Sequence, residues 1–509
     1  MPPSAPETAD VVIVGAGPVG LMLAAELCLS GVRPVVVERS AERAAEPKAG
    51  GITGQVVRLL DHRGLYERLS GDSAPPAPLP AYVYGAMPLW LHGWEDNPLY
   101  GFTIQQWHLE AGLEEWALGL GADLRRGHDL VGFTQDADGV TVELSTGTLR
   151  AGYLVGCDGG HSAVRALAGI AFPGVTSRRM TTRAADVVVP DSVRELLTDD
   201  ALPGGLSYRR TDTGVLASIA LPGTHRIVAI EWDRPEVPAD VPVTFDEIRE
   251  AVARVYGREL PMSEPGTDGP RLLRRLGGTN TRLAGDYRVG RVFVAGDAAH
   301  VHSSIGAPGL NVGLQDAANL GWKLAAEIGG WAPPGLLGTY HEERHCAGRR
   351  MMMFTLAQLA LLSPGSESTA VREVFGALLA EPANTRQIAT MLAGADVRYP
   401  TAGPDDHPLA GLWVPDLRLT RAGRPVRLAE LARTGRSLLV DLSGDGQAAG
   451  IAAAWTDRVD LVTAAAENAP AEALLVRPDG YVAWAGDRGR GLTEALRRWY
   501  GEPASTPAA

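Results

Sequence analysis

Short, continuous apolar runs recur in the first 300 residues of the chain. They lie at 11–14, 35–37, 153–156 and 291–295, and each has the length of a strand. Apolar runs without alternation are typical of parallel strands that are buried on both faces of a sheet. A helical run at 21–29 follows the first of them. The pattern therefore predicts an α/β fold around a parallel sheet.

The pattern changes in the middle of the chain. Between Met180 and Trp232, segments separated by Pro and Gly turns predict an antiparallel sheet. Thr244 and Glu247 have the spacing of a capping box, which opens a helix that ends near Tyr256. The predicted strands of this sheet are 185–189, 206–210, 215–220 and 226–232.

Other elements follow from the same kinds of pattern. We expect a polar loop at 44–54, helices at 56–69 and 336–362, and strands at 124–131 and 140–144. The last hundred residues predict strands at 437–441, 459–462, 474–476 and 481–484 and a closing helix at 492–500, with the turn Pro478-Asp479-Gly480 joining the last two strands as a hairpin.

Composition excludes several classes of function. The chain has 509 residues, with 47 basic and 60 acidic side chains and a net charge of −13. This balance argues against nucleic acid or an anionic membrane as a partner. Met1 to Asp10 lack the features of a signal peptide, and no stretch approaches a membrane span. Three widely spaced cysteines, Cys28, Cys157 and Cys346, match no disulfide or metal pattern and predict a cytoplasmic protein.

The most specific motif is the unit from Val11 to Glu38. A strand is followed by Gly15, Gly17 and Gly20, then by a helix, a second strand and a terminal carboxylate. The first glycine permits a tight turn, the second lets the backbone approach a pyrophosphate, and the third lets the helix pack closely on the strand. Glu38 has the position of the acid that holds the adenosine ribose. The unit predicts a dinucleotide site.

Further motifs show a resemblance to a known family. Glu38-Arg39, then Pro47-Lys48-Ala49-Gly50-Gly51-Ile52, then residues 59–65 resemble the flavin-dependent aromatic hydroxylases of the para-hydroxybenzoate and phenol hydroxylase type. The family usually has arginine where Lys48 stands, and lysine lacks the planar fork of arginine. By this resemblance the cofactor is FAD. Gln106 is implied to contact it and Leu130 to lie near its adenine, and Asp158 belongs to a motif linked to both FAD and the nicotinamide donor.

A third motif, around Asp297, is also predicted to bind the cofactor. Asp297 follows the strand at 291–295, where it can accept hydrogen bonds from ribityl hydroxyls. A helix begins near Leu310 and Asn311, and its N-terminus can stabilise negative charge on a reduced flavin. Ser303 to Gly309 departs from the family pattern, and Pro308 removes one N–H donor. The predicted cofactor-binding residues are Gly15, Gly17, Pro18, Val19, Gly20, Glu38, Arg39, Lys48, Gln106, Leu130, Asp158, Asp297, Gly309, Leu310 and Asn311.

Three other features have two interpretations. The aromatic residues Tyr84, Trp90 and Trp94 suit a flat polycyclic substrate, but hairpin core is an equally good explanation. His300 and His302 lack the spacing of metal ligands, so we predict loop hydrogen bonds and no metal. A basic segment, Arg344 to Arg350, is interpreted as a solvated or ion-paired helix face.

The resemblance also implies the domain organisation. We expect a Rossmann-like FAD-binding domain in two parts, an inserted antiparallel substrate domain, and a C-terminal thioredoxin-like domain that contains no cysteine and serves in packing or dimerisation. The expected limits are 1–179 and 276–398 for the FAD-binding parts, 180–275 for the substrate domain and 399–509 for the last domain.

The predicted activity is that of an FAD-dependent aromatic monooxygenase that consumes NADH or NADPH and O2. In such enzymes, as the resemblance implies, a C4a-hydroperoxyflavin transfers one oxygen atom to a polycyclic aromatic substrate of the polyketide type, and no catalytic acid or base is assigned here. Three alternatives remain open: a Baeyer-Villiger or ring-rearranging oxygenase, a rifampicin-type antibiotic-inactivating hydroxylase, and a flavin-binding protein without catalysis. A homodimer is also expected.

Overall fold

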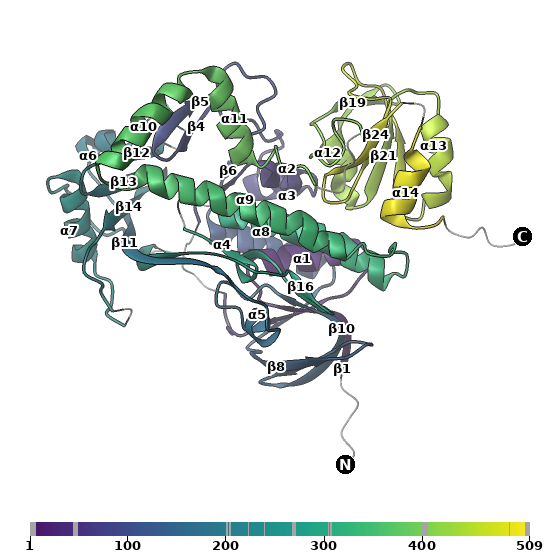
Figure 1. Ribbon diagram of the computed structural model, residues 1–509, viewed down its shortest axis with the longest axis horizontal. Coiled ribbons are helices and arrows are strands. Elements are labelled where there is room, and N and C mark those ends of the chain that lie inside the picture. Colours follow the sequence, from purple (N-terminus) through teal and green to yellow (C-terminus); the bar gives the residue numbers. More distant parts are fainter. Residues whose placement is uncertain are drawn as a thin grey trace, which may run out of the picture.

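Three bodies make up the molecule in the computed structural model (Figure 1). The structure describes residues 7–503 apart from 44–48, 200–201, 203–204, 222, 239, 267–270, 304, 306–307, 400–405 and 488. A central α/β body contains the N-terminal strand, an antiparallel sheet extends from it, and the C-terminal body lies beside it. The predicted fold class is confirmed.

The central sheet is mostly parallel and has the strand order β16-β17-β10-β1-β2-β7, with β9 and β8 continuing from β10. Parallel pairing joins β10 to β1 and β17, and β2 to β1 and β7. The four apolar runs predicted as buried parallel strands therefore lie side by side. The strands are β1 (Glu7–Val14), β2 (Val35–Glu38), β7 (Asp123–Arg126), β8 (Leu130–Gln135), β9 (Val140–Leu144), β10 (Gly147–Gly156), β16 (Arg288–Val289) and β17 (Val292–Val294).

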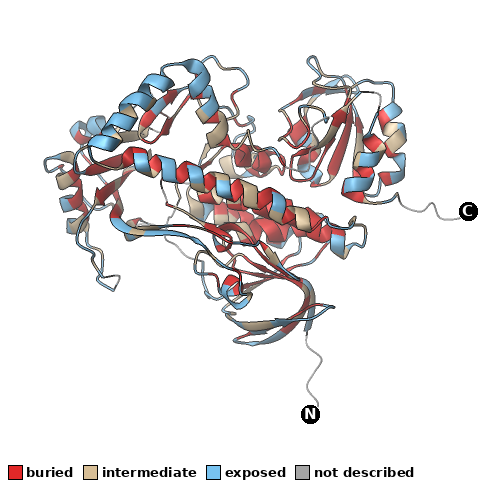
Figure 2. Ribbon diagram, viewed as in Figure 1, coloured by how far each residue is buried: buried red, intermediate tan, exposed pale blue. Residues whose placement is uncertain are grey.

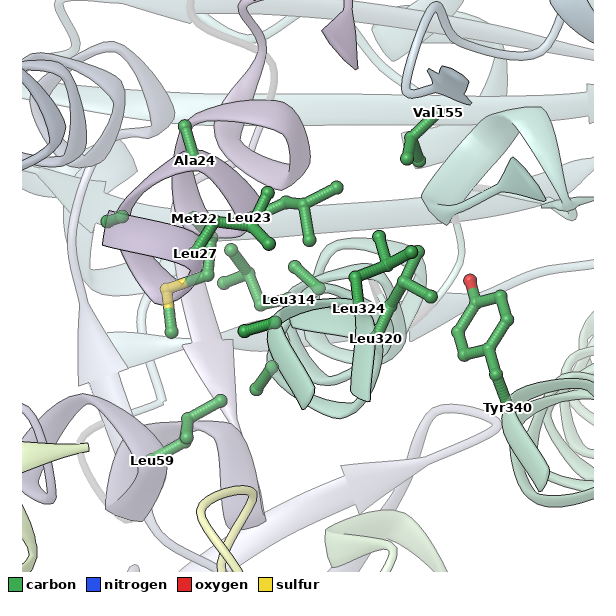
Figure 3. Close-up of a cluster of buried hydrophobic side chains, with 14 of the residues drawn as sticks. Met22, Leu23, Ala24, Leu27, Leu59, Val155, Leu314, Leu320, Leu324 and Tyr340 are labelled. Carbon is green, nitrogen blue, oxygen red and sulfur yellow. The ribbon is translucent and has the colours of Figure 1, made fainter. Parts of the chain in front are cut away.

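Helices cover this sheet and share its core. The helices are α1 (Pro18–Leu29), α4 (Gln106–Gly119), α5 (Ala163–Leu167), α8 (Pro308–Ile328) and α9 (Gly338–Leu362). Eight of the 12 residues of α1 are buried, which explains why its sequence is apolar around the helix. Figure 3 shows Leu23 and Leu27 of α1 close to Leu314 of α8, with Tyr340 of α9 beyond. Figure 2 shows that burial is concentrated in these central elements.

The second sheet is antiparallel, with the strand order β12-β13-β14-β11-β15-β18. The helix α7 (Phe245–Tyr256) packs on one face and ends where the sequence predicts. Half of the predicted capping box forms, because Thr244 Oγ1 accepts a hydrogen bond from the Glu247 N–H at 3.2 Å while the Glu247 carboxylate binds arginines of the sheet. The strands are β11 (Gly174–Val187), β12 (Ser207–Arg210), β13 (Gly214–Leu221), β14 (Thr224–Trp232), β15 (Leu273–Leu283) and β18 (His300–Val301); α6 (Asp191–Leu197) lies nearby.

The sequence did not predict β15, which lies between β11 and β18 in the antiparallel sheet. It pairs with β11 from Leu273 to Arg282, and the paired residues are 88 to 108 positions apart in the chain. Polar and basic residues dominate it, so its sequence lacks the usual alternation of a strand. Both β11 and β15 cross the domain limits expected at 179/180 and 275/276. The limits themselves stay predictions.

Three further local predictions were wrong in whole or in part. The helix expected at 56–69 is two helices, α2 (Gln55–Asp61) and α3 (Leu65–Ser70), because Gly64 between them has a φ of 68°. The strand expected at 124–131 is β7 and β8, which are separated at Gly127 with a φ of 73°. Part of the loop expected at 44–54 is the short strand β3 (Gly51–Thr53), paired with β6 (Gly101–Thr103).

A small lobe stands above the second sheet in Figure 1. It combines the hairpin β4 (Ala81–Tyr84) and β5 (Met87–Trp90) with α10 (Ser366–Leu379) and α11 (Pro382–Ala393). The side chains between them form a separate apolar cluster around Leu89, Leu99 and Phe354.

The C-terminal body has the predicted thioredoxin-like sheet, with the strand order β22-β21-β23-β24. Its first pair is parallel and the other two are antiparallel. All three cysteines lie outside it. The elements are β19 (Arg418–Arg421), β20 (Arg424–Arg427), α12 (Leu428–Leu431), β21 (Ser437–Asp441), α13 (Gln447–Ala452), β22 (Val459–Thr463), β23 (Ala473–Val476), β24 (Val482–Gly486) and α14 (Leu492–Tyr500).

Candidate active site

A cavity of about 710 Å³ lies between the central sheet and the antiparallel sheet. It opens at the carboxyl ends of β1, β10 and β17, which is the edge where open α/β sheets bind ligands. The antiparallel sheet forms the opposite wall. Its lining residues include Gly17, Pro18, Val19, Gln106, Glu110, Cys157, His161, Met180, Thr182, Arg274, Leu276, Asp297, His302, Gly309 and Leu310.

The glycine turn after β1 has the shape that the sequence predicts. Gly15 has a φ of 106°, and a Cβ atom there would lie 2.5 Å from the Cys157 carbonyl oxygen. A Cβ on Gly20 would collide with the Gly15 carbonyl oxygen, so the helix can approach the strand only at a glycine. No atom of a described residue lies within 4 Å of a Cβ on Gly17, which faces the cavity. The turn therefore leaves open space in front of the N-terminus of α1.

The third motif places a carboxylate and a helix N-terminus on the same cavity. Asp297 is exposed in a short 3-10 turn after β17. Pro308 is the first residue of α8, where an N–H has no partner within the helix, so the proline costs little there. Gly309 and Leu310 line the cavity at this helix end. Positive potential at the N-terminus of α8 thus faces a site that can receive negative charge.

Comparison with known proteins covers nearly the whole chain. The family described as "FAD binding domain" matches residues 8–355, and "Aromatic-ring hydroxylase, C-terminal" matches residues 407–503. The 12-dehydrotetracycline 5-monooxygenase/anhydrotetracycline 6-monooxygenase of Streptomyces rimosus subsp. rimosus is 41% identical, over 97% of this chain and 99% of that protein. The rifampicin monooxygenase of Streptomyces venezuelae is 39% identical, over 97% of this chain and 98% of that protein. The structure of the OxyS anhydrotetracycline hydroxylase from Streptomyces rimosus matches with a TM-score of 0.85 and 40% sequence identity. The match covers 98% of this chain and 100% of that one.

The chain belongs to the FAD-dependent aromatic hydroxylases. It is an FAD-dependent monooxygenase with NAD(P)H as co-substrate, as the sequence predicted. The residues present fit this cofactor, because the open space at Gly17 and the two helix N-termini lie on one cavity. Within the described residues, no helix of this hydroxylase is both long and apolar enough to cross a membrane.

Two residues predicted to bind FAD, Glu38 and Asp158, form hydrogen bonds within the protein. Glu38 accepts hydrogen bonds from the Ala16 and Ser40 N–H groups, both at 2.9 Å. Asp158 accepts from Ser162 Oγ at 2.5 Å and from the Val164 N–H at 3.1 Å. Glu38 thus ties the glycine turn to β2, and Asp158 orders the start of α5. Their contacts with the cofactor stay predictions.

Four other residues predicted to bind the cofactor differ in whether they line the cavity. Gln106 lines the cavity and donates to Glu110 Oε1 at 2.8 Å. Arg39 and Leu130 lie away from it, at the end of β2 and the start of β8. Lys48 lies outside the described residues, as does part of the departure from the family pattern at 303–309.

The predicted aromatic contacts with substrate are not part of the cavity wall. Tyr84 is buried against Phe354 and Phe375, Trp94 packs on the same cluster, and Trp90 is half exposed. None of the three lines the cavity. This placement supports the alternative interpretation, in which these rings form hairpin core.

Both histidines form hydrogen bonds, but only His302 lies in a loop, because His300 belongs to β18. His300 Nε2 lies 2.7 Å from Asp316 Oδ2 in a fully buried pair. His302 Nδ1 lies 2.5 Å from the Ser303 carbonyl oxygen, and its ring lies against Gly309. Burial lowers the pKa of His302, so the ring is neutral near pH 7 with its proton on Nδ1. Among the residues the structure describes, no cluster of side chains could hold a metal ion.

The sequence did not predict that residues of the antiparallel sheet line the cavity. Met180 and Thr182 of β11 and Arg274 and Leu276 of β15 face it together, because Thr182 pairs with Leu276 in the ladder. No local signal marks these positions, since β15 is recognised only once it pairs with β11. Cys157 also lines the cavity, but burial raises the pKa of its thiol, which supports a structural role.

Proposed function

We propose that this monooxygenase hydroxylates a planar polycyclic phenol or quinone of the polyketide type. One observation carries the proposal: the same cavity reaches from Gly17 and Asp297 on the cofactor side to Met180 and Leu276 on the sheet. A volume of about 710 Å³ lies within the range of roughly 300–1,000 Å³ that is usual for ligand pockets. Two relatives named for tetracycline-type and rifampicin substrates support the same class.

FAD supplies the redox chemistry when bound, accepting a hydride from NAD(P)H and activating O2. The chain supplies position, electrostatics and dryness. The N–H groups at the start of α8 stabilise negative charge beside Gly309. Met180 and Leu276 exclude water from the substrate side.

The donor NAD(P)H has no Rossmann unit of its own in the sequence, because only one complete glycine unit follows a strand. We propose that it binds transiently. Whether NADH or NADPH is preferred is decided by comparing the rates of flavin reduction with the two donors. The homodimer and the cytoplasmic location stay predictions of the sequence.

Reaction under ¹⁸O₂ tests the proposal. A panel of tetracyclic and angular polyketide phenols, together with rifampicin, is incubated with enzyme and NADPH, and products are analysed by mass spectrometry. We expect at least one polyketide to accelerate NADPH oxidation and to gain one labelled oxygen atom as a hydroxyl. A labelled lactone indicates Baeyer-Villiger oxidation, and labelling of rifampicin alone indicates the antibiotic-inactivating alternative. Label found only in peroxide or water contradicts the proposal.

A further inference from the structure

The C-terminal domain inserts two charged side chains into the core of the FAD-binding domain. Arg477 and Asp479 belong to the turn between β23 and β24, and they are 3% and 2% exposed. Arg477 forms a bidentate ion pair with Glu343 of α9, with distances of 2.7 and 2.8 Å. It also donates to Asp479 at 3.0 and 2.5 Å. The turn is therefore held by charge as well as by packing.

The same cluster includes the polar face of α8. Asn319 Nδ2 donates to Asp479 Oδ2 at 2.8 Å and to Glu343 Oε2 at 2.7 Å. Lys323 Nζ donates to Glu343 Oε2 at 2.6 Å and to Asn319 Oδ1 at 2.8 Å. All of these side chains are buried. A buried charge is tolerated only when it is paired and fully hydrogen-bonded, so each member constrains its neighbours.

One turn nearer the cavity, α8 presents Asp316 to the flavin side. Its carboxylate accepts from the Gly296 N–H at 3.1 Å, from His300 Nε2 at 2.7 Å and from Arg344 Nε at 2.7 Å. Burial alone would raise the pKa of Asp316, but Arg344 and His300 hold it below its usual value. Gly296 has a φ of 62° and precedes Asp297, which lines the cavity. Asp316 therefore fixes the backbone that carries Asp297.

Two sets of contacts connect the part of this network around Arg477 and Asp479 with the part around Asp316. Asp316, Asn319 and Lys323 share one face of α8 at helical spacing, and Glu343 and Arg344 are adjacent on α9. Arg344 Nη1 also donates to Tyr399 Oη at 3.2 Å, and the Tyr399 ring stacks on Tyr481, two residues beyond Asp479, at 3.8 Å. Three cations, Lys323, Arg344 and Arg477, balance three anions, Asp316, Glu343 and Asp479. Loss of Arg477 leaves the cluster with a net negative charge.

We propose that Arg477 and Asp479 are positioning residues of the cofactor site: they hold the polar faces of α8 and α9 in the arrangement in which Asp316 fixes the Gly296–Asp297 turn. The C-terminal domain then has a role that needs no cysteine. It closes a charge network whose other end is the backbone beside the flavin.

The test compares Arg477→Met with Arg427→Met. Arg427 also bridges the C-terminal domain to the FAD-binding domain, through Asp61 at 2.7 Å, but forms no hydrogen bond or ion pair with α8 in the described structure. Two quantities are measured on folded apoprotein: FAD affinity by fluorescence titration, and hydrogen exchange of the Gly296 amide, whose N–H is bonded to Asp316. Asp316→Asn serves as the positive control.

We expect Arg477→Met to weaken FAD binding by roughly twofold to thirtyfold, the range of coupling through packed networks, and to speed exchange at Gly296. Arg427→Met should change neither quantity. If Arg477→Met does not fold, Asp479→Asn, which keeps the size of the side chain, decides the question by the same two measurements. Unchanged FAD affinity and unchanged exchange at Gly296, or equal changes in the Arg427→Met control, would overturn the proposal.

Discussion

Asn311 of α8 and Thr53 of β3 are joined by two hydrogen bonds. The Asn311 amide donates to Thr53 Oγ1 at 3.1 Å, and the Thr53 backbone N–H donates to Asn311 Oδ1 at 3.2 Å. The side chain of Asn311 thus forms hydrogen bonds within the protein, and its contact with the cofactor stays a prediction. The pair fixes this helix end against the segment that follows residue 50.

Replacing Asn311 with Leu should therefore weaken both stability and cofactor binding. The change removes the acceptor of the Thr53 backbone N–H, and a donor left unpaired away from water costs about 1–3 kcal/mol. Thermal unfolding of the apoprotein and FAD titration measure the two effects. Asn384→Leu, on the exposed side of α11, removes one exposed hydrogen bond, to the Leu378 carbonyl oxygen, and is the matched control that should keep normal FAD binding. Normal FAD affinity in Asn311→Leu would show that the pair has no part in the site.

Gly17→Val should abolish FAD binding while the protein stays folded. Among the described residues no atom lies within 4 Å of a Cβ at this position, so the valine side chain projects into the space in front of α1. Flavin absorbance of the purified variant gives the occupancy. Gly119→Val, which also adds a side chain in open space but at the far end of α4, should remain yellow. A fully occupied Gly17→Val protein would contradict the assignment of the pyrophosphate site.

Replacement of Cys28, Cys157 and Cys346 together by Ala should leave turnover essentially intact. Burial raises the pKa of Cys28 to about 11 and that of Cys157 well above its usual value, so neither thiol is a thiolate at neutral pH. Turnover is compared with parent enzyme at equal FAD content. A folded, FAD-loaded triple variant without activity would reveal a catalytic thiol.

Stability should fall in acid as Glu343 is protonated. Burial raises the pKa of this carboxyl, but Arg477 and Lys323 outweigh burial and lower it to about 2, from 4.5 when unfolded. A depressed folded-state pKa gives stability that is complete above about pH 4.5 and is lost as the pH falls toward 2. Thermal midpoints between pH 7 and pH 3 record the loss.

Variants of neighbouring glutamates test the assignment of that acid effect. Glu343→Gln should be less stable at pH 7, because it leaves Arg477 and Lys323 without their shared anion, and its midpoint should depend less on pH. Glu342→Gln, the exposed neighbour on α9, should keep the pH dependence of the parent. If the thermal midpoint of Glu343→Gln depends on pH as strongly as that of the parent, Glu343 is not the group responsible for the acid sensitivity.

The sequence by itself determined the cofactor unit and the fold class. Gly15, Gly17 and Gly20 carry their information locally, because a turn that excludes Cβ atoms needs glycine at fixed spacing, and the strands beside it are continuous apolar runs. The strand, turn and helix around Asp297 are local in the same way, as is the hairpin at 478–480. Local patterns also failed at Gly64 and Gly127, where a single positive φ divides an otherwise continuous pattern.

Only the tertiary structure determined which residues of the antiparallel sheet line the cavity and which buried charges pair with one another. The pairing of β11 with β15 brings Thr182 beside Leu276 across about ninety residues, and an arginine-rich strand has no periodic signal of its own. In the sequence, Arg344 is one of several basic residues on a helix, and its burial against Asp316 is set by α8. Arg477 likewise meets Glu343 only after two domains pack. Periodicity records which face of an element is buried, whereas partners distant in the chain are fixed by packing and by the need to pair every buried charge.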